Sequence, residues 1–313
     1  MVSLSASLKD NCKFDYSVKE IVDRHGSWVK NDKYMILARW NKKKWINDFF
    51  AVKCSKRGND VYKTRVLRRF SGLSALSEKL VFFNPKSRGK KTTKALFTTL
   101  TYDTKLCSFQ DAWIKIGVQF NKFMAYIRKQ FGKISSCRIF ESFENGHPHI
   151  HCILLFEKSF KVFRDAKGKF RVHEKELIAQ GWHSNVDVQA MYSVAGALRY
   201  LKKYLLKSIS YDEADSKGKK TLALCWTSRK RAFSVSVSFR RKLRDLIRYL
   251  HNSNKKTVQI TLEGEVLPEE KFHLLAFVSL EVILIKKDVW FTKLDSKQIT
   301  ALDKHLSEHK KFY

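Results

Sequence analysis

The chain has 313 residues, of which 44% are hydrophobic and 13% aromatic, enough to fill a sizeable core and to exclude a disordered composition. It carries 62 lysines and arginines against 30 aspartates and glutamates, a formal net charge of +32. A charge of this size attracts a polyanion, and the usual one is nucleic acid. The alternative is a soluble protein with a lysine-rich surface.

Cysteine usage and hydropathy bear on compartment. The six cysteines contain no CxxC pair, so we expect no zinc ribbon. The first residues lack the apolar stretch of a signal peptide, and no segment approaches the roughly 20 apolar residues of a membrane span. The most apolar segment, residues 273–285, is interrupted by Glu281 and predicts a buried strand. We therefore expect a cytoplasmic protein of the host cell with reduced thiols and no membrane partner.

The chain divides into three expected parts. Residues 1–90 are a basic accessory region of helices and short strands, residues 91–210 are the core, and residues 211–313 are a basic C-terminal region, packed on the core in one reading. The segment SRGKKTTK at 87–94 predicts a linker or a loop that contacts phosphate. The GxxxxGK spacing of a P-loop is absent, so no motor ATPase is indicated.

Helices and strands become legible from residue 95. Composition and periodicity predict a strand, an amphipathic helix, a strand, a turn at Asn145-Gly146 and another strand. These elements cover 95–103, 109–131, 136–144 and 149–157. A basic loop, a short helix, a strand and a second amphipathic helix follow at 158–172, 173–181, 183–191 and 193–207. The last expected elements are extended structure at 221–239 and a basic helix at 240–250.

The stretch GHPHIHCILLFE at 146–157 concentrates three of the ten histidines. Because strand side chains alternate between faces, His149 and His151 share one face, while Pro148 separates them from His147 at the strand start. Two imidazoles at this spacing can bind a divalent metal with a third ligand, which Glu141 or Glu144 could supply. The alternative is a pair of surface histidines on a half-buried sheet.

The helix at 193–207 presents two stripes. One stripe is apolar and forms a core face. The other contains Tyr200, Lys203, Tyr204 and Lys207, which recur at helical spacing. A phenol can act as a covalent nucleophile, and nearby cations stabilise the charge of a phosphoryl group. The alternative is an exposed aromatic and basic face without chemistry.

Together these motifs resemble the HUH endonuclease superfamily, in its branch of two-tyrosine rolling-circle replication initiators from archaeal plasmids and viruses and from phages. FTTLTYD at 97–103 matches the first motif, GHPHIHCILLF at 146–156 the second and YLKKYLLK at 200–207 the third. The resemblance covers about residues 95–210. It implies an α+β fold with a central antiparallel sheet flanked by helices, related to the ferredoxin-like layout, with N- and C-terminal extensions.

The resemblance also implies a reaction. A Mn²⁺ or Mg²⁺ ion held by His149, His151 and Glu141 would polarise a phosphate of single-stranded or origin hairpin DNA. Tyr200 and Tyr204 would be the catalytic nucleophiles, with Lys203 and Lys207 beside them. The product would be a 5′-phosphotyrosine link and a 3′-hydroxyl that primes replication by the host machinery. His147 departs from the two-histidine pattern, and we expect it on the turn, in contact with phosphate.

Other activities share parts of this pattern. A two-tyrosine HUH transposase has the same chemistry, whereas the tyrosines of a conjugative relaxase usually precede the histidine motif. A non-catalytic, metal-containing DNA-binding protein is the alternative of another class. Basic segments at 87–94, 158–172, 228–231 and 240–248 would neutralise phosphates. Four aromatic residues either stack on bases or belong to the core: Phe163, Phe170, Trp182 and Trp226.

Overall fold

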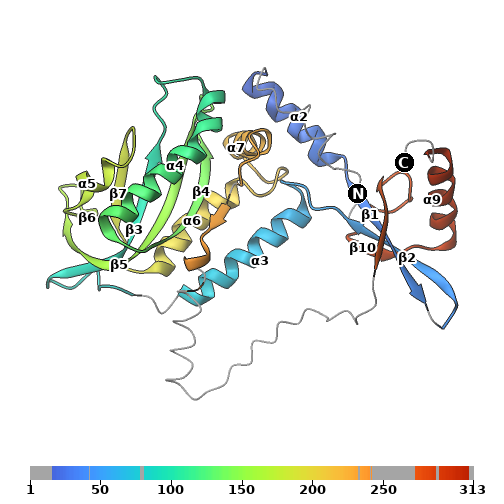
Figure 1. The fold of residues 1–313 in the computed structure, drawn as a ribbon, viewed down its shortest axis with the longest axis horizontal. Helices are drawn as coiled ribbons and strands as arrows, with labels where there is room; N and C mark the ends of the chain where they lie inside the picture. Colours follow the sequence, from blue (N-terminus) through green and yellow to red (C-terminus); the bar gives the residue numbers. More distant parts are fainter. Residues whose placement is uncertain are drawn as a thin grey trace, which may run out of the picture.

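The computed structural model describes residues 16–41, 43–77, 81–231, 233–239, 241, 272–286 and 289–309. They form an α+β fold with two antiparallel sheets flanked by helices (Figure 1), which confirms the expected fold class. Among these residues, no helix combines the length and the apolar character that crossing a membrane requires.

The larger sheet carries the three sequence motifs. Its strand order is β7-β3-β5-β4-β8, and β6 pairs with the far end of β5. The strands are β3 (Lys91–Thr101), β4 (Ile134–Ser142), β5 (Pro148–Arg164), β6 (Phe170–Val172), β7 (Val186–Ala190) and β8 (Phe233–Val235). The four strands predicted between residues 95 and 191 are confirmed, although their ends shift. β3 begins inside the basic segment at 87–94, so only the first part of that segment is a loop.

Helices cover both faces of this sheet. α4 (Phe109–Phe131) buries apolar residues spaced three and four apart against one face, together with the even-numbered residues Ile150 to Phe156 of β5. Ser108 caps its start by accepting a hydrogen bond from the Asp111 amide, and Gly132 ends it at a positive φ of 80°. α6 (Val194–Lys207) packs on the opposite face, with Ile153 and Leu155 of β5. Strand alternation therefore directs His149 and His151 toward the α6 side.

The turn between β4 and β5 follows its sequence signal. The Gly146 amide donates to the Phe143 carbonyl at 3.0 Å, and the Phe143 amide donates to the His147 carbonyl at 2.8 Å. Gly146 has a φ of 89°, and a Cβ there would meet side chains of Val18 and Phe109 at 3.1 and 3.3 Å. The Asn-Gly turn is thus held between two helices, and Pro148 opens β5 as predicted.

The smaller sheet joins the two ends of the chain. Its order is β10-β2-β1-β9, and its apolar cluster includes Leu302 of α9 (Ser296–His309). The strands are β1 (Lys33–Asn41), β2 (Ile46–Lys53), β9 (His273–Ser279) and β10 (Phe291–Lys293). The remaining helices are α2 (Val18–Lys30), α3 (Asp60–Ser77), α5 (Lys175–Ala179) and α7 (Ser216–Thr227). The boundaries at 90 and 210 stay a prediction.

Three local predictions were wrong. Residues 221–227 belong to helix α7 rather than to extended structure, because Asp215 caps the helix and its apolar run is buried near α2 and β4. A continuous apolar run does not by itself distinguish a buried strand from a buried helix. The basic loop at 158–172 is instead a hairpin of β5 and β6, because the Asp165 carboxylate accepts backbone hydrogen bonds from Lys167 and Lys169 across its turn.

Residues 273–279 form a strand, as predicted, but it is not buried. β9 lies at the edge of the smaller sheet, and Leu274, Leu275 and Phe277 are 43–54% exposed. The rest of the segment leaves the sheet in turns. The basic helix predicted at 240–250 lies, apart from Arg241, outside the described residues.

Candidate metal centre and tyrosine pair

Neighbouring strands bring Glu141, His149 and His151 together. Glu141 of β4 pairs directly with His149 of β5, and His151 follows on the same face. All three side chains are buried on the α6 side of the sheet, with residue exposures of 4–6%. The sequence pattern left a surface pair open, and this burial excludes it.

The donor atoms of this triad converge on one point. The Nε2 atoms of His149 and His151 lie 2.8 and 2.9 Å from the same oxygen, Oε2 of Glu141, and 3.1 Å from each other. Ligand atoms bound to one ion at about 2.1 Å lie about 3 Å apart. The triad Glu141–His149–His151 therefore has the donor set and the spacing of a divalent metal site, and it is the one such cluster among the described residues.

Surrounding side chains orient the two imidazoles. The Thr99 hydroxyl lies 3.2 Å from Nδ1 of His151, and when Nδ1–H donates to it, the Nε2 lone pair faces the triad. The Phe143 ring stacks on His149 with centroids 4.4 Å apart. Nδ1 of His149 is buried and has no protein partner. These contacts fix the rings and leave both Nε2 atoms available as ligands.

The charges of the site favour an ionised carboxylate. Burial alone would raise the pKa of Glu141, but hydrogen bonds from His149, His151 and Lys217 outweigh burial and hold that pKa well below its ordinary value. Burial lowers the pKa of His151. A neutral imidazole beside an ionised carboxylate is the protonation state that metal binding requires.

Lys217 is a site residue that the sequence analysis missed. Its Nζ lies 2.9 Å from Oε1 of Glu141, so the carboxylate is shared between Lys217 and the histidines. Lys217 reaches Glu141 because α7 starts close to the end of α6: a Cβ on Gly218 would collide with the Lys207 carbonyl oxygen. No motif marks this lysine, and its segment precedes a run predicted to be extended.

α6 places the two predicted tyrosines side by side at the triad. The Tyr204 ring stacks on His151 with centroids 3.8 Å apart and an interplanar angle of 23°. Its hydroxyl donates to the hydroxyl of Tyr200 at 2.9 Å, and Tyr200 is 42% exposed. Burial and this hydrogen bond raise the pKa of Tyr204. Both phenols are thus next to the candidate metal ligands, one partly covered and one open to solvent.

The two predicted lysines of this helix are less engaged. Lys203 is exposed and Lys207 is half-buried, and within the described residues neither has a hydrogen bond or ion pair to the triad. The structure therefore brings Tyr200 and Tyr204 to the histidines but assigns the nearest ammonium group to Lys217. The catalytic roles of Lys203 and Lys207 stay predictions.

His147 does not occupy the position expected from sequence. It is buried, its amide donates to Oδ1 of Asn145, and its Nε2 lies 3.0 Å from the Cys107 carbonyl oxygen. These contacts join the turn to the segment that precedes α4, so the expected exposure to phosphate is wrong. Neither His147 nor Glu144, which is exposed, belongs to the metal-binding cluster.

The four candidate stacking aromatics separate by burial. Trp182 is buried, and its indole donates to the Thr101 carbonyl, while Phe170 packs edge-on against Phe83. Trp226 packs against Trp28 between α7 and α2. Phe163, on the β5–β6 hairpin, is 40% exposed. Three of the four thus have packing roles, and Phe163 is the open ring.

The comparisons with known proteins bear on the same region. Residues 95–209 match the family model of the replication-associated proteins of the ORF2 type. This similarity supports a replication initiator family. The match contains the triad and both tyrosines and ends before Lys217. The chain has no significant match among curated proteins or solved structures.

Proposed function

We propose that this protein is a site-specific single-stranded DNA endonuclease and strand transferase that initiates rolling-circle replication. The observation that carries the proposal is the stacking of Tyr204 on His151, which puts a pair of phenols against a buried two-histidine, one-carboxylate cluster. The family match adds the replication context. The net charge of +32 suits a DNA substrate.

The proposed reaction is a transesterification. The Oη atom of Tyr200 or Tyr204 attacks the scissile phosphorus, a tyrosyl O–P bond forms, and the P–O3′ bond breaks. The products are a 5′-phosphotyrosine and a 3′-hydroxyl, which takes up a proton and is free for a host polymerase. The energy of the phosphodiester is kept in the link, so no nucleotide hydrolysis is needed.

The hydrogen bond between the phenols gives the proton a route. Tyr204 donates to Tyr200, whose hydroxyl is open to solvent, so a proton lost from Tyr204 passes to Tyr200 as Tyr200 releases its own. Having two phenols allows one link to be resolved by the second, with strand joining as the reverse reaction. The half-exposed ammonium of Lys217 is placed to meet the charge of the phosphate.

The triad fits a divalent ion, since two neutral imidazoles and one carboxylate leave coordination positions open. Glu141, His149 and His151 would hold Mn²⁺ or Mg²⁺, which when bound supplies Lewis-acid polarisation of the scissile phosphate. Imidazole ligands favour Mn²⁺ over Mg²⁺.

Covalent capture of DNA tests the proposal. The full chain is incubated with a 5′- or 3′-labelled pool of single-stranded DNA and Mn²⁺, and denaturing gels reveal protein–DNA adducts. We expect adducts carrying the DNA 3′ of the nick, partial loss of the nick-and-join cycle in Y200F and Y204F, and no adduct in the double variant. Y126F, which removes a hydroxyl bonded to the Leu177 carbonyl on the other face of the sheet, is the matched control.

The outcomes separate the competing functions. Adducts in the double variant would refute the tyrosine assignment. DNA binding without any adduct in the wild-type protein would indicate the non-catalytic metal-containing binder. Excision of element ends, with no nicking of a supercoiled plasmid at an origin, would indicate the transposase.

A further inference from the structure

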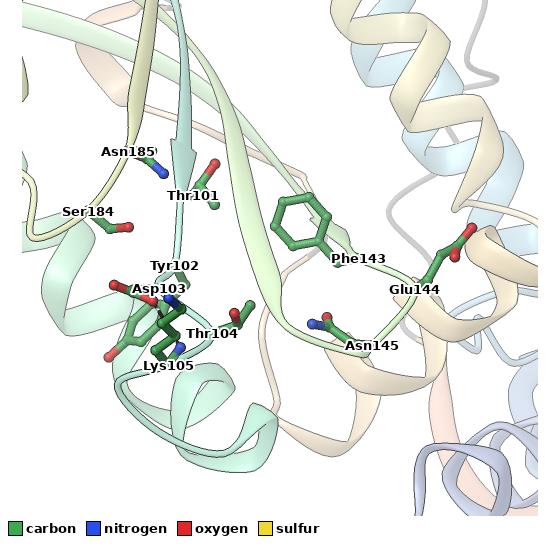
Figure 2. A pocket seen from close by; sticks show the side chains of 10 residues that line it. All are labelled: Thr101, Tyr102, Asp103, Thr104, Lys105, Phe143, Glu144, Asn145, Ser184 and Asn185. Carbon is green, nitrogen blue, oxygen red and sulfur yellow. Dashed lines mark hydrogen bonds between the residues drawn. The ribbon is translucent and has the colours of Figure 1, made fainter.

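A cleft of about 730 Å³ opens beside the metal-binding triad at the end of β3. Its lining comes from three segments: the end of β3, the β4–β5 turn and the loop before β7 (Figure 2). The lining residues used below are Thr101, Asp103, Lys105, Phe143, Glu144, Asn145 and Asn185. The triad does not include any of them.

The sheet register joins this cleft to the triad. Thr101 is the β3 partner of His149, so the cleft starts one strand away from a metal ligand on the same face. Phe143 lines the cleft and also stacks on His149, with an interplanar angle of 29°. A ligand in the cleft would therefore touch a ring that itself contacts the metal centre.

The chemistry of the lining disfavours a phosphate. Lys105 is the single cation in the lining, and it is outnumbered by the carboxylates of Asp103 and Glu144. In a chain with twice as many cations as anions, an acidic lining is unusual. The occupant that fits is uncharged.

Two amides suit the edge of a base. Asn145 and Asn185 are both exposed, and Figure 2 shows their amide groups on opposite sides of the cleft. Oδ1 of Asn145 accepts from the His147 amide, which directs the NH₂ group elsewhere. An amide can donate and accept at the edge of a nucleobase, and an aromatic ring such as Phe143 can stack on its face.

We infer that this cleft receives one unstacked nucleobase of the single-stranded DNA, next to the scissile phosphate, and reads its edge through Asn185 and Asn145. The inference rests on the proposed function for its substrate. Flipping a base into the cleft places the adjoining phosphate over the triad, so the cleft sets the position of the cut.

Selection of bound sequences in EDTA tests the cleft without any chemistry. The full-length wild-type protein, N185A and N145A are each mixed with a randomised single-stranded DNA pool, and the bound fraction is sequenced. We expect the wild type to prefer one base at one position, and we expect N185A to lose about tenfold of that preference while keeping salt-dependent binding. N47A, which removes an exposed amide from the smaller sheet, is the matched control and should select as wild type does.

A second arm uses an abasic nucleotide at the selected position. It should weaken wild-type binding by about the same factor as N185A, and N185A should lose nothing more on the abasic strand. The inference is overturned if the wild type shows no positional preference, or if N185A and N145A keep it unchanged. Adduct formation with Mn²⁺ on the selected strand is scored separately, so a failure of the nicking reaction is distinguishable from a failure of the cleft.

Discussion

The substitution of Glu141 by glutamine tests the metal centre most directly. The amide keeps the size of the side chain and one oxygen, but it removes the negative charge that faces His149, His151 and Lys217. The fixed charge around the ion then rises from about zero, with Glu141 offsetting Lys217, to about +1. Metal affinity should therefore fall sharply.

The scale of the loss follows from Coulomb's law. The ligand atoms of the triad lie within 4.8 Å of one another, so the altered charge acts at short range. Two unit charges about 4 Å apart interact by about 4 kcal/mol in a partly buried site. Since about 1.4 kcal/mol corresponds to a factor of ten, we expect Mn²⁺ affinity to fall about a thousandfold.

Calorimetry or electron paramagnetic resonance with Mn²⁺ alone measures this affinity without a DNA substrate. E144Q is the matched control, because Glu144 is exposed at the adjoining turn and lies outside the triad. Circular dichroism establishes that both variants are folded. If E141Q binds Mn²⁺ within about threefold of wild type, the triad is not the metal site.

The remaining predictions concern charge. K217M should slow adduct formation about tenfold while leaving Mn²⁺ affinity equal or higher, because the ammonium competes for the Glu141 charge; K217R should retain activity, K219M is the control on the same helix, and unchanged K217M kinetics would contradict the role. Burial lowers the pKa of His25 to about 4, so the unfolded chain takes up a proton below about pH 6.5 and the folded chain does not. Stability should then fall by about 3 kcal/mol between pH 6.5 and 4, and more below pH 4.3, where unfolded Glu141 also binds a proton. Urea titrations at several pH values should show a flatter profile for H25Q and an unchanged one for H173Q; equal slopes would remove His25 as the cause.

The sequence was sufficient where local patterns determine structure. Strand alternation put His149 and His151 on one face, and the apolar spacing of residues 109–131 predicted α4, because side-chain periodicity depends only on backbone geometry. The Asn145-Gly146 turn fixed the pairing of β4 with β5, and this pairing brought Glu141 opposite His149.

Tertiary packing decided what those patterns left open. The periodicity of α6 gave two stripes but not their neighbour, and only the packing of α6 on the sheet stacks Tyr204 on His151. The apolar run at 222–226 had no period that distinguishes helix from strand, so α7 and Lys217 followed from an Asp215 cap and from burial against α2. His147 was placed by a carbonyl group 40 residues earlier in the chain.

The cleft beside the triad illustrates the same division. Its walls come from three segments between residues 101 and 185, and none of them has a sequence signal for a binding site. The sequence by itself determined the strands, the α6 helix and the ligand types. Which side chains meet depends on long-range burial and strand order, because those energies are set by contacts between residues far apart in the chain.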